Sequence, residues 1–536
     1  MKKSHSLAAL LLLSLICVAA LGMTPPAELP TVLNIKKEKQ LFVDYRLIES
    51  SEGMSLSMHE PYQTGERLVV TDQPWEKGLT MGGYCTVLRE EGPNGPIVRL
   101  WYDISDVATG GMPGKGLLGV AYAESSDGIH FRKRPLGLVE WNGSKENNLV
   151  MPTDVSKSAV GGGSVFRDEN PNCPPDQRYK SWSKFYSTPG TRRGANRTWY
   201  SADGLNWKLY DTVPTGLRKA DTQPTWFWDS RIGRYIGYSR EWVDISEDQT
   251  IRMVGYNESD DMLHWENFSL TLKPDELDGN SLPPIRVLPT DGMQKGAKEG
   301  TEDVSPTSGR MDFYGPGIFK YKETQNVYFS ILPAFHHLTR KNGKSWPDTG
   351  DLQLAVSRDA RNFRRLGGRR PFLRLGMEGS FYSKWIWPVL QPLRMGDELW
   401  LYYWGTNSNH SSVVDPKAKE LDSAISRAIL RLDGFVSVDA AYSGGWLTTP
   451  PLTFEGSRLE LNLDTSAGGI AQVELQDVAG KPVSGFSLAE ADILNGNSVR
   501  MPVSWKGSTD LSSLAGKVVR LHFKLRDSRL YAFQFQ

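Results

Sequence analysis

Short apolar runs alternate with turn-forming residues along most of the chain. In residues 225–241, for example, the runs TWFWD and RYIGYSRE flank the turn SRIG. Short runs rich in Val, Ile, Tyr, Phe and Trp between Gly, Pro, Asn and Asp clusters are typical of β-strands. Five hairpins of this kind follow one another between residues 83 and 405. With 52 Gly and 32 Pro in 536 residues, the pattern predicts an all-β protein.

A repeated motif follows four of these hairpins. Ser and Asp side chains accept hydrogen bonds from nearby backbone N–H groups, so Ser-x-Asp followed by an aromatic four residues later indicates a turn that packs back on its sheet. We interpret the four Asp residues as turn formers and not as catalytic groups. The four copies are SSDGIHF (125–131), SADGLNW (201–207), SDDMLHW (259–265) and SRDARNF (357–363). Five meanders that share one turn predict a five-bladed β-propeller.

The ends of the chain complete this architecture. We expect ISRAILRLDGFVSV (425–438) and LFVDYRLIE (41–49) to supply strands that close the last blade. Beyond about residue 440, alternating apolar and polar strands separated by short turns predict a β-sandwich. The predicted domains are a five-bladed β-propeller over 23–440 and a C-terminal β-sandwich over 441–536.

The first 22 residues have the composition of an export signal. Two lysines precede an almost wholly apolar stretch, Leu7 to Gly22, which ends in small residues. The stretch is too short for a comfortable membrane span. We predict a cleavable signal peptide over 1–22, no membrane span, and a secreted or periplasmic protein.

The net charge argues against a nucleic-acid partner, and the cysteine content leaves two states open. Removal of residues 1–22 takes away Lys2 and Lys3 and leaves 60 basic against 62 acidic residues, a net charge of −2. Nucleic-acid binding usually needs a basic face, so no nucleic-acid partner is expected. Cys85 and Cys173 remain in the mature chain, either as one disulfide or as two buried thiols. The sequence leaves the oligomeric state open.

The candidate chemistry gathers at one end of the hairpins. The start of the first strand and the end of the second lie at the same end of an antiparallel pair, away from its turn. That end concentrates acids, histidines and rings, which suit acid–base chemistry on a sugar. The catalytic candidates are Asp221, Asp312 and Glu378, with Glu241 and Glu76 as substitutes. The candidates for substrate binding are Gln223, Arg240, Tyr314, His336, His337, Tyr382, Trp404, His410 and Asp103.

Plainer interpretations stay open for several of these residues. Asp221 and Asp312 could each cap a turn. Adjacent residues on a strand point to opposite faces, so at most one of His336 and His337 faces the axis. Of Asp221 and Glu241, we expect Asp221 to face the axis.

Eight segments carry a resemblance to a known group of proteins. They are LFVDYRLIE, DQPWEKG, LGLVEWNGSKENNLV, DTQPTWFWDSRIGRYIGYSR, MDFYGPG, DELWLYYWG, LRLDGFVSVDA and LYAFQF. The propeller half resembles the five-bladed superfamily that contains glycoside hydrolase families 32, 43, 62 and 68. The chain is also similar to secreted, glycosyl-hydrolase-like proteins of planctomycete-type bacteria. The resemblance implies three acids around the axis: a base or nucleophile, a general acid, and a third that orients the substrate. The family 32 motifs Asn-Asp-Pro-Asn and Glu-Cys are missing.

These observations lead to one main hypothesis and two alternatives. The main hypothesis is an exported glycoside hydrolase that cleaves poly- or oligosaccharides with a pair of carboxylates and no organic cofactor. A non-catalytic, lectin-like propeller is the first alternative. A sialidase-like enzyme is the second, but it requires six blades and an arginine triad. No catalytic metal is expected; a structural Ca²⁺ near His336 or His337 is a further hypothesis.

Overall fold

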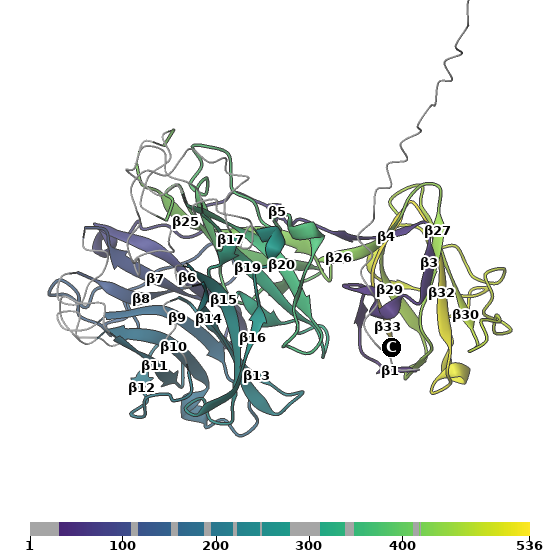
Figure 1. Cartoon of the computed structure of the whole chain (residues 1–536), viewed down its shortest axis with the longest axis horizontal. Helices are drawn as coiled ribbons and strands as arrows, with labels where there is room; N and C mark the ends of the chain where they lie inside the picture. Colours follow the sequence, from purple (N-terminus) through teal and green to yellow (C-terminus); the bar gives the residue numbers. More distant parts are fainter. Residues whose placement is uncertain are drawn as a thin grey trace, which may run out of the picture.

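The computed structural model of the chain is almost entirely β-structure, arranged in two lobes (Figure 1). Asp221 and the predicted signal peptide lie outside the described residues. The described residues are 32–108, 116–151, 159–186, 194–217, 222–246, 249–278, 311–337, 348–410, 417–418 and 420–536.

The larger lobe is a five-bladed β-propeller, as predicted. Its blades follow chain order, and the strands that pair within a blade are antiparallel. Blade one contains β6 (Leu79–Gly92), β7 (Gly95–Asp106) and β8 (Leu118–Ser125). Blade two contains β9 (Ala159–Arg167), β10 (Tyr179–Tyr186), β11 (Gly194–Ser201) and β12 (Lys208–Leu209). Blade three contains β13 (Thr225–Asp229), β14 (Arg234–Ser246), β15 (Gln249–Ser259) and β16 (Trp265–Leu272).

The last two blades are joined into one hydrogen-bonded sheet. A single parallel bridge between Gly350 and Trp385 connects them. Blade four contains β17 (Met311–Phe313), β18 (Ile318–Lys320), β19 (Tyr328–His336), β20 (Thr349–Ser357) and β21 (Arg364–Arg365). Blade five contains β22 (Trp385–Pro388), β23 (Leu393–Met395), β24 (Glu398–Thr406) and β25 (Ser423–Arg431). A parallel bridge from Thr86 to Leu390 brings blade five against blade one.

The strand that closes the ring is shorter than predicted and comes from another segment. β5 (Tyr62–Gln63) pairs with β25, and Val69 forms a further bridge to Ile425. The prediction that LFVDYRLIE closes the propeller is wrong. In that segment β2 (Gln40–Leu41) pairs with β33 (Ser528–Phe535) of the second lobe, and the residues after it form a short 3₁₀ helix, η1 (Tyr45–Leu47).

The Ser-Asp motifs form the turns that the sequence predicts. In the second copy Ser201 Oγ accepts a hydrogen bond from Gly204 N at 2.9 Å, and Asp203 Oδ1 accepts from Leu205 N and Asn206 N at 2.8 Å each. Trp207 Nε1 then donates to Gly204 O at 3.0 Å, which seals the turn. The other three copies repeat the Asp contacts. These aspartates are therefore structural.

The smaller lobe is a β-sandwich built from both ends of the chain. A six-stranded sheet runs β31-β29-β33-β26-β4 with β2 beside β33, a four-stranded sheet runs β3-β27-β32-β30, and β1 pairs with β28. The N-terminal strands are β1 (Leu33–Lys36), β2, β3 (Ser50–Glu52) and β4 (Met54–Met58). The C-terminal strands are β26 (Val436–Ala440), β27 (Gly445–Thr448), β28 (Leu452–Phe454), β29 (Leu459–Asp464), β30 (Ile470–Gln476), β31 (Asn497–Pro502), β32 (Arg520–Arg526) and β33.

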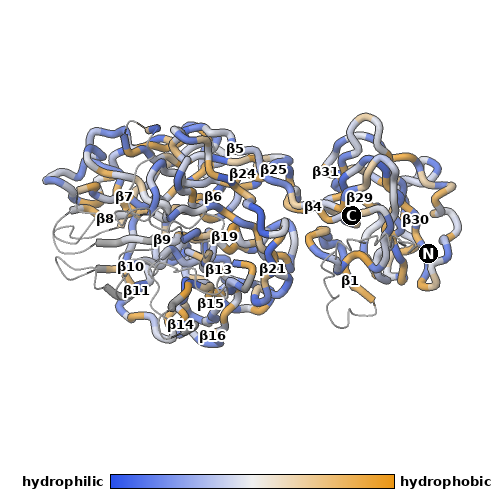
Figure 2. The backbone as a smooth tube through the Cα atoms, turned by 45° about the horizontal axis from the view of Figure 1, so that its top comes forward, coloured by the Kyte–Doolittle hydropathy of each residue, from blue (hydrophilic) through white to orange (hydrophobic). Residues whose placement is uncertain are grey.

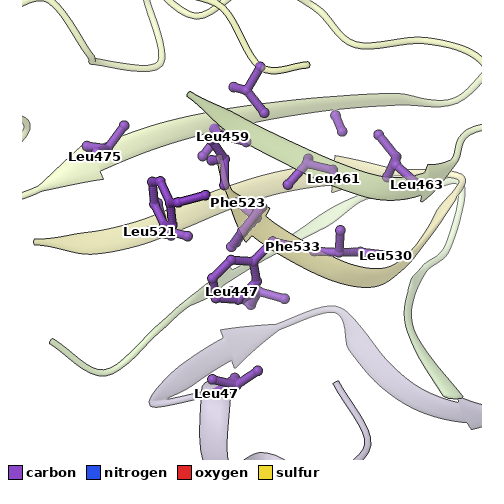
Figure 3. Packing of buried hydrophobic residues seen from close by; sticks show 14 of the residues in the cluster. Leu47, Leu447, Leu459, Leu461, Leu463, Leu475, Leu521, Phe523, Leu530 and Phe533 are labelled. Carbon is purple, nitrogen blue, oxygen red and sulfur yellow. The ribbon is translucent and has the colours of Figure 1, made fainter. Parts of the chain in front are cut away.

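The predicted domain boundaries therefore need correction. The segment from β1 to β4 and the strand β26 were assigned to the propeller, but they belong to the sandwich. Leu447 and Leu461 are fully buried between its sheets together with Phe523 (Figure 3). Short 3₁₀ helices occupy the connections: η2 (Pro74–Glu76), η3 (Pro175–Gln177), η4 (Glu276–Asp278), η7 (Gly367–Arg369) and η8 (Ser512–Leu514).

The two lobes share one apolar cluster. β4 and β26 run from the propeller into the sandwich, and both views show the lobes meeting there (Figures 1 and 2). Phe435 stacks on Phe329 of blade four with ring centroids 4.0 Å apart. Beside it, Tyr321 OH donates to Asp433 Oδ1 at 2.6 Å. Buried rings and a buried hydrogen bond fix the lobes to each other.

Cys85 and Cys173 are both free thiols, so the disulfide alternative is wrong. Cys85 is fully buried, and burial raises the pKa of its thiol. Within the described part of the chain, no helix is long and apolar enough to cross a membrane.

Candidate active site

Two arginines on one face of blade three form the base of the candidate site. In the β14–β15 pair, Trp242 lies opposite Arg252 and Arg240 lies opposite Val254. Because side chains alternate along a strand, Arg240, Trp242 and Arg252 project from the same face. Arg240 and Arg252 are only 1 % and 0 % exposed. Full burial of two guanidinium groups is costly unless charges and hydrogen bonds compensate it.

Asp312 on β17 supplies a negative charge to this face. The Arg252 Nε atom lies 3.1 Å from the Asp312 carboxylate, and Arg252 N donates to Asp312 Oδ2 at 3.2 Å. His337 Nε2 lies 3.2 Å from the same carboxylate and 3.3 Å from Arg252 Nη2. Asp312 is fully buried. The three side chains form one buried network that joins blades three and four.

Aromatic rings cover this network. Arg252 lies 3.8 Å from the centroid of the Phe335 ring, which stacks on Tyr314 at 5.2 Å. Arg240 lies 4.4 Å from the centroid of Tyr314. Guanidinium groups over ring faces are attracted by the ring quadrupole. We call the following set the axial cluster: Arg240, Trp242, Arg252, Asp312, Tyr314, Phe335, His337, Trp385, Trp387 and His410.

The axial cluster opens toward solvent at Tyr314 and His410. Tyr314 is half-buried, and its OH lies 2.9 Å from His410 Nε2. His410 lies at the rim, and its ring packs against Tyr314, Phe335 and Trp385. Desolvation and the positive charges of Arg252 and Arg240 lower the pKa of His410 to about 3. At neutral pH His410 is therefore an uncharged hydrogen-bonding group.

Gln223 does not line a binding surface, contrary to prediction. Its Nε2 donates to Cys85 O of blade one at 3.0 Å and to Gly163 O of blade two at 3.2 Å. Its Oε1 accepts from Trp387 Nε1 of blade five at 3.2 Å. With both ends of its amide used and 2 % exposure, Gln223 ties three blades together at the axis.

Glu241 projects away from the axial cluster. It lies between Arg240 and Trp242, and its Oε1 accepts from Ser239 Oγ at 2.8 Å on the opposite face of the blade. A Cβ atom at Gly255, which shares that face, would lie 2.7 Å from Glu241 Cγ. Glu241 is 2 % exposed, and it does not share a face with Arg252.

Glu76 and Glu378 lie outside the axial cluster. Glu76 is buried and accepts hydrogen bonds from Lys133 Nζ at 2.6 Å and from Tyr102 OH at 3.0 Å. It also accepts hydrogen bonds from the backbone N–H groups of Asp72 and Gln73. That network holds blade one and is structural. Glu378 forms an ion pair with Lys417 at 2.6 Å, and its side chain is 56 % exposed.

The other predicted binding residues have separate surroundings. His336 points away from His337 and pairs with Asp351 at 3.1 Å. Burial alone would lower the pKa of His336, but its hydrogen bond with Asp351 outweighs this effect and raises the pKa. Trp404 lies opposite Trp387 in the strand register and beside Gly83, at the edge of the axial cluster. The other two candidates lie elsewhere: Tyr382 packs on Tyr403, and Asp103 is buried beside Gly82.

The sequence analysis, which considered the ends of the hairpin strands, identified part of the axial cluster. Of the predicted residues, the structure groups Arg240, Asp312, Tyr314, His337 and His410. It also places Arg252, Trp242, Phe335, Trp385 and Trp387 there, which the sequence analysis missed. Arg252 could have been predicted from the sequence. It lies near the start of β15, which is at the same end of blade three as the end of β14.

The axial cluster combines a buried carboxylate with flat aromatic faces. Within the residues that the structure describes, no group of three or more His, Cys, Asp or Glu side chains could hold a metal ion. A carboxylate fixed by Arg252 and His337 can orient polar groups beside it, and the rings offer flat faces. Neutral His410 can donate or accept a hydrogen bond at the rim.

The fold and this cluster define an all-β propeller with a polar, ring-lined axial end and an attached β-sandwich. No model of a known protein family matches the chain, and no curated protein matches it.

Several solved structures are distantly similar to the chain. An N-acetylgalactosamine deacetylase from F. plautii is 14% identical with a TM-score of 0.42 and covers 71% of this chain and 96% of its own. A thermostable family-43 glycoside hydrolase is 14% identical with a TM-score of 0.39, covering 70% of this chain and 96% of its own. A fructofuranosidase from Schwanniomyces occidentalis is 12% identical with a TM-score of 0.38, covering 88% and 97%. At these identities and TM-scores the likeness assigns no activity to this chain.

Proposed function

We propose that the protein is an exported glycoside hydrolase acting on poly- or oligosaccharides at the axial end of the propeller. The observation that carries this proposal is the buried Asp312–Arg252–His337 network beneath the Tyr314 and Phe335 rings. It combines a fixed carboxylate with flat apolar faces, which is the combination that sugar chemistry requires.

The contacts of each acid suggest its role. Asp312 is fully enclosed and ion-paired, so we assign it to positioning: it holds Arg252, which lies against Tyr314 and Phe335. We retain Asp221, three positions before Pro224 at the start of blade three, as the reacting carboxylate. Glu241 is buried on the opposite face of that blade from Arg252, so we do not assign it as the second reacting carboxylate. The distance between the two reacting carboxylates in a substrate complex would decide between retention and inversion.

A hydrolysis screen tests the proposal. The purified full chain would be incubated with a panel of plant and algal oligosaccharides, beside Asp221→Asn and Asp312→Asn. We expect reducing sugar from at least one member of the panel. Asp221→Asn should lower kcat by about a thousandfold, and Asp312→Asn by a smaller factor of about a hundred. Unchanged turnover in both variants would refute the assigned site.

A lectin-like propeller is the second candidate, and one observation favours it. Asp312 and Glu378 are both ion-paired, which leaves recognition as a role for the rings without requiring acid–base chemistry. In that case the panel would show binding of a glycan, weakened by Tyr314→Ala, with no hydrolysis by the wild-type protein.

A further inference from the structure

The inner strand of blade one, β6, contains a β-bulge near its start. The pairing of β6 with β7 breaks between Met81 and Cys85. Residues 82–84 together oppose only Asp103 of β7. Bulges are frequent beside active sites, where the extra residues redirect a side chain out of the regular alternation. The side chain that this bulge redirects is Tyr84.

Two glycines allow the bulge to pack closely against its neighbours. A Cβ atom at Gly83 would lie 2.9 Å from Trp387 Cβ and 3.0 Å from Trp404 Cε3, which is closer than side chains normally approach. A Cβ atom at Gly82 would lie 3.1 Å from Asp103 Cβ. Glycine in a strand often marks such a close approach. The backbone of blade one therefore lies directly against Trp387 of blade five.

Tyr84 joins the axial cluster through both its ring and its hydroxyl. The ring is in edge contact with Trp387, with centroids 5.3 Å apart and planes at 68°. The hydroxyl accepts a hydrogen bond from Thr222 Oγ1 of the segment that leads into blade three, at 3.1 Å. Thr222 precedes Gln223, which donates to Cys85 O. Because the inner strands start at the axial end, Tyr84 lies one residue nearer to that end than the Gln223 contacts.

Two half-buried tyrosines thus contact one buried tryptophan at the axial end. Tyr84 is half-buried, although Met81 and Cys85 on either side of the bulge are fully buried. Tyr314 of blade four is also half-buried, and its ring lies 5.4 Å from Trp387 with planes at 87°. Trp387 itself is 3 % exposed, so it supports the two tyrosine rings and offers little surface of its own. Tyr84 and Tyr314 are the members of this ring group that a ligand can reach.

We propose that Tyr84 binds substrate at the axial end, and that the ligand there is a glycan of at least two sugar units, one against Tyr314 and the next against Tyr84. The inference rests on the proposed function, because it names the substrate class of the same site. Aromatic rings offer apolar faces to the C–H surface of sugars, and a phenol hydroxyl forms hydrogen bonds with sugar hydroxyls. Two accessible rings on different blades suit a chain of sugars better than a single unit.

Titration calorimetry on the full-length protein tests the proposal. The probes are hexasaccharides of cellulose, xylan, mannan, starch, levan and laminarin, each beside the methyl glycoside of its constituent sugar. We expect the wild type to bind at least one hexasaccharide. Tyr84→Leu keeps apolar bulk but removes the flat ring, so it should weaken that binding by about tenfold and leave the methyl glycoside unaffected. Tyr84→Phe keeps the ring and should stay within about threefold of the wild type.

Tyr200→Leu is the matched control, because Tyr200 is a half-buried tyrosine that packs on another ring, Tyr210, in blade two. It should bind the hexasaccharide as the wild type does, with melting temperatures as a check on folding. A crystal of the wild type soaked with the hexasaccharide needs no variant, and a sugar unit should contact the Tyr84 ring there.

Several results would overturn the role of Tyr84. They are no binding of any probe by the wild type, wild-type affinity in folded Tyr84→Leu, an equal loss for hexasaccharide and methyl glycoside, or a soaked crystal without sugar at Tyr84. The failure of the proposed activity looks different: the expected binding pattern without hydrolysis would count only against that activity. Hydrolysis with an unchanged KM in Tyr84→Leu would count only against the role of Tyr84.

Discussion

At the scale of single residues, Arg252 should be the side chain on which the stability of the axial cluster depends most. Replacement by Met keeps the volume but leaves the buried Asp312 carboxylate without its cation. We expect Arg252→Met to lower the free energy of unfolding by about 3–5 kcal/mol, measured by urea denaturation. The double variant Arg252→Met/Asp312→Leu should regain much of that loss. A loss below about 1 kcal/mol in the single variant would contradict the ion pair described here.

His336 should make the stability of blade four depend on pH. Asp351 raises the pKa of His336 in the folded protein above its unfolded value. The stabilisation is therefore fully present below the unfolded pKa of about 6.5 and is lost as the pH rises through the folded pKa. The melting temperature of His336→Gln should fall below that of the wild type at pH 6, and the gap should narrow at pH 8.5. An equal gap at both pH values would contradict this account.

Which side chains share the axial cluster could be predicted only in part. Asp312, Tyr314 and His337 follow from the ends of strands, because hairpin geometry places these ends together. Gln223 was misjudged because its amide reaches three blades, and those contacts come from segments that are distant in sequence. The local pattern of apolar and polar residues carries no information about contacts between such distant segments.

At the scale of secondary-structure elements, the repeated turns should contribute measurably to stability. Burial alone would raise the pKa of Asp203, but hydrogen bonds from Asn206 and Leu205 outweigh it and lower the pKa to about 2. Asp203→Ala removes these acceptors and should cost about 1 kcal/mol at pH 7 in a urea titration. The difference from wild type should be present above pH 4 and shrink as the pH falls toward 2. A pH-independent difference would show that the carboxylate charge is not involved.

The turns and hairpins could be predicted because their signals are local: Ser, Asp and an aromatic ring within seven residues. LFVDYRLIE was assigned to the wrong sheet for the opposite reason. Its apolar residues predict a buried segment, and Phe42 and Leu47 are indeed fully buried, but in the sandwich core. Nothing in the segment itself distinguishes one apolar core from another.

At the scale of the whole molecule, the two lobes should behave as one structure. The C-terminal residues 441–536 lack β1, β2, β3 and β26, which pair with their strands. We expect a fragment of residues 441–536 to show no cooperative thermal transition by circular dichroism. A cooperative transition in that fragment would mean that the shared strands are dispensable.

The central claim is that the axial cluster is an active site for glycosidic bond cleavage. The most direct measurement is kcat/KM of Asp312→Asn and Glu378→Gln on the best oligosaccharide of the screen, with melting temperatures as a check on folding. Both carboxylates are ion-paired, but only Asp312 lies in the axial cluster. We expect Asp312→Asn to lose about a hundredfold and Glu378→Gln to stay within about threefold of wild type. Equal values for the two folded variants, or a larger loss in Glu378→Gln, would contradict the account.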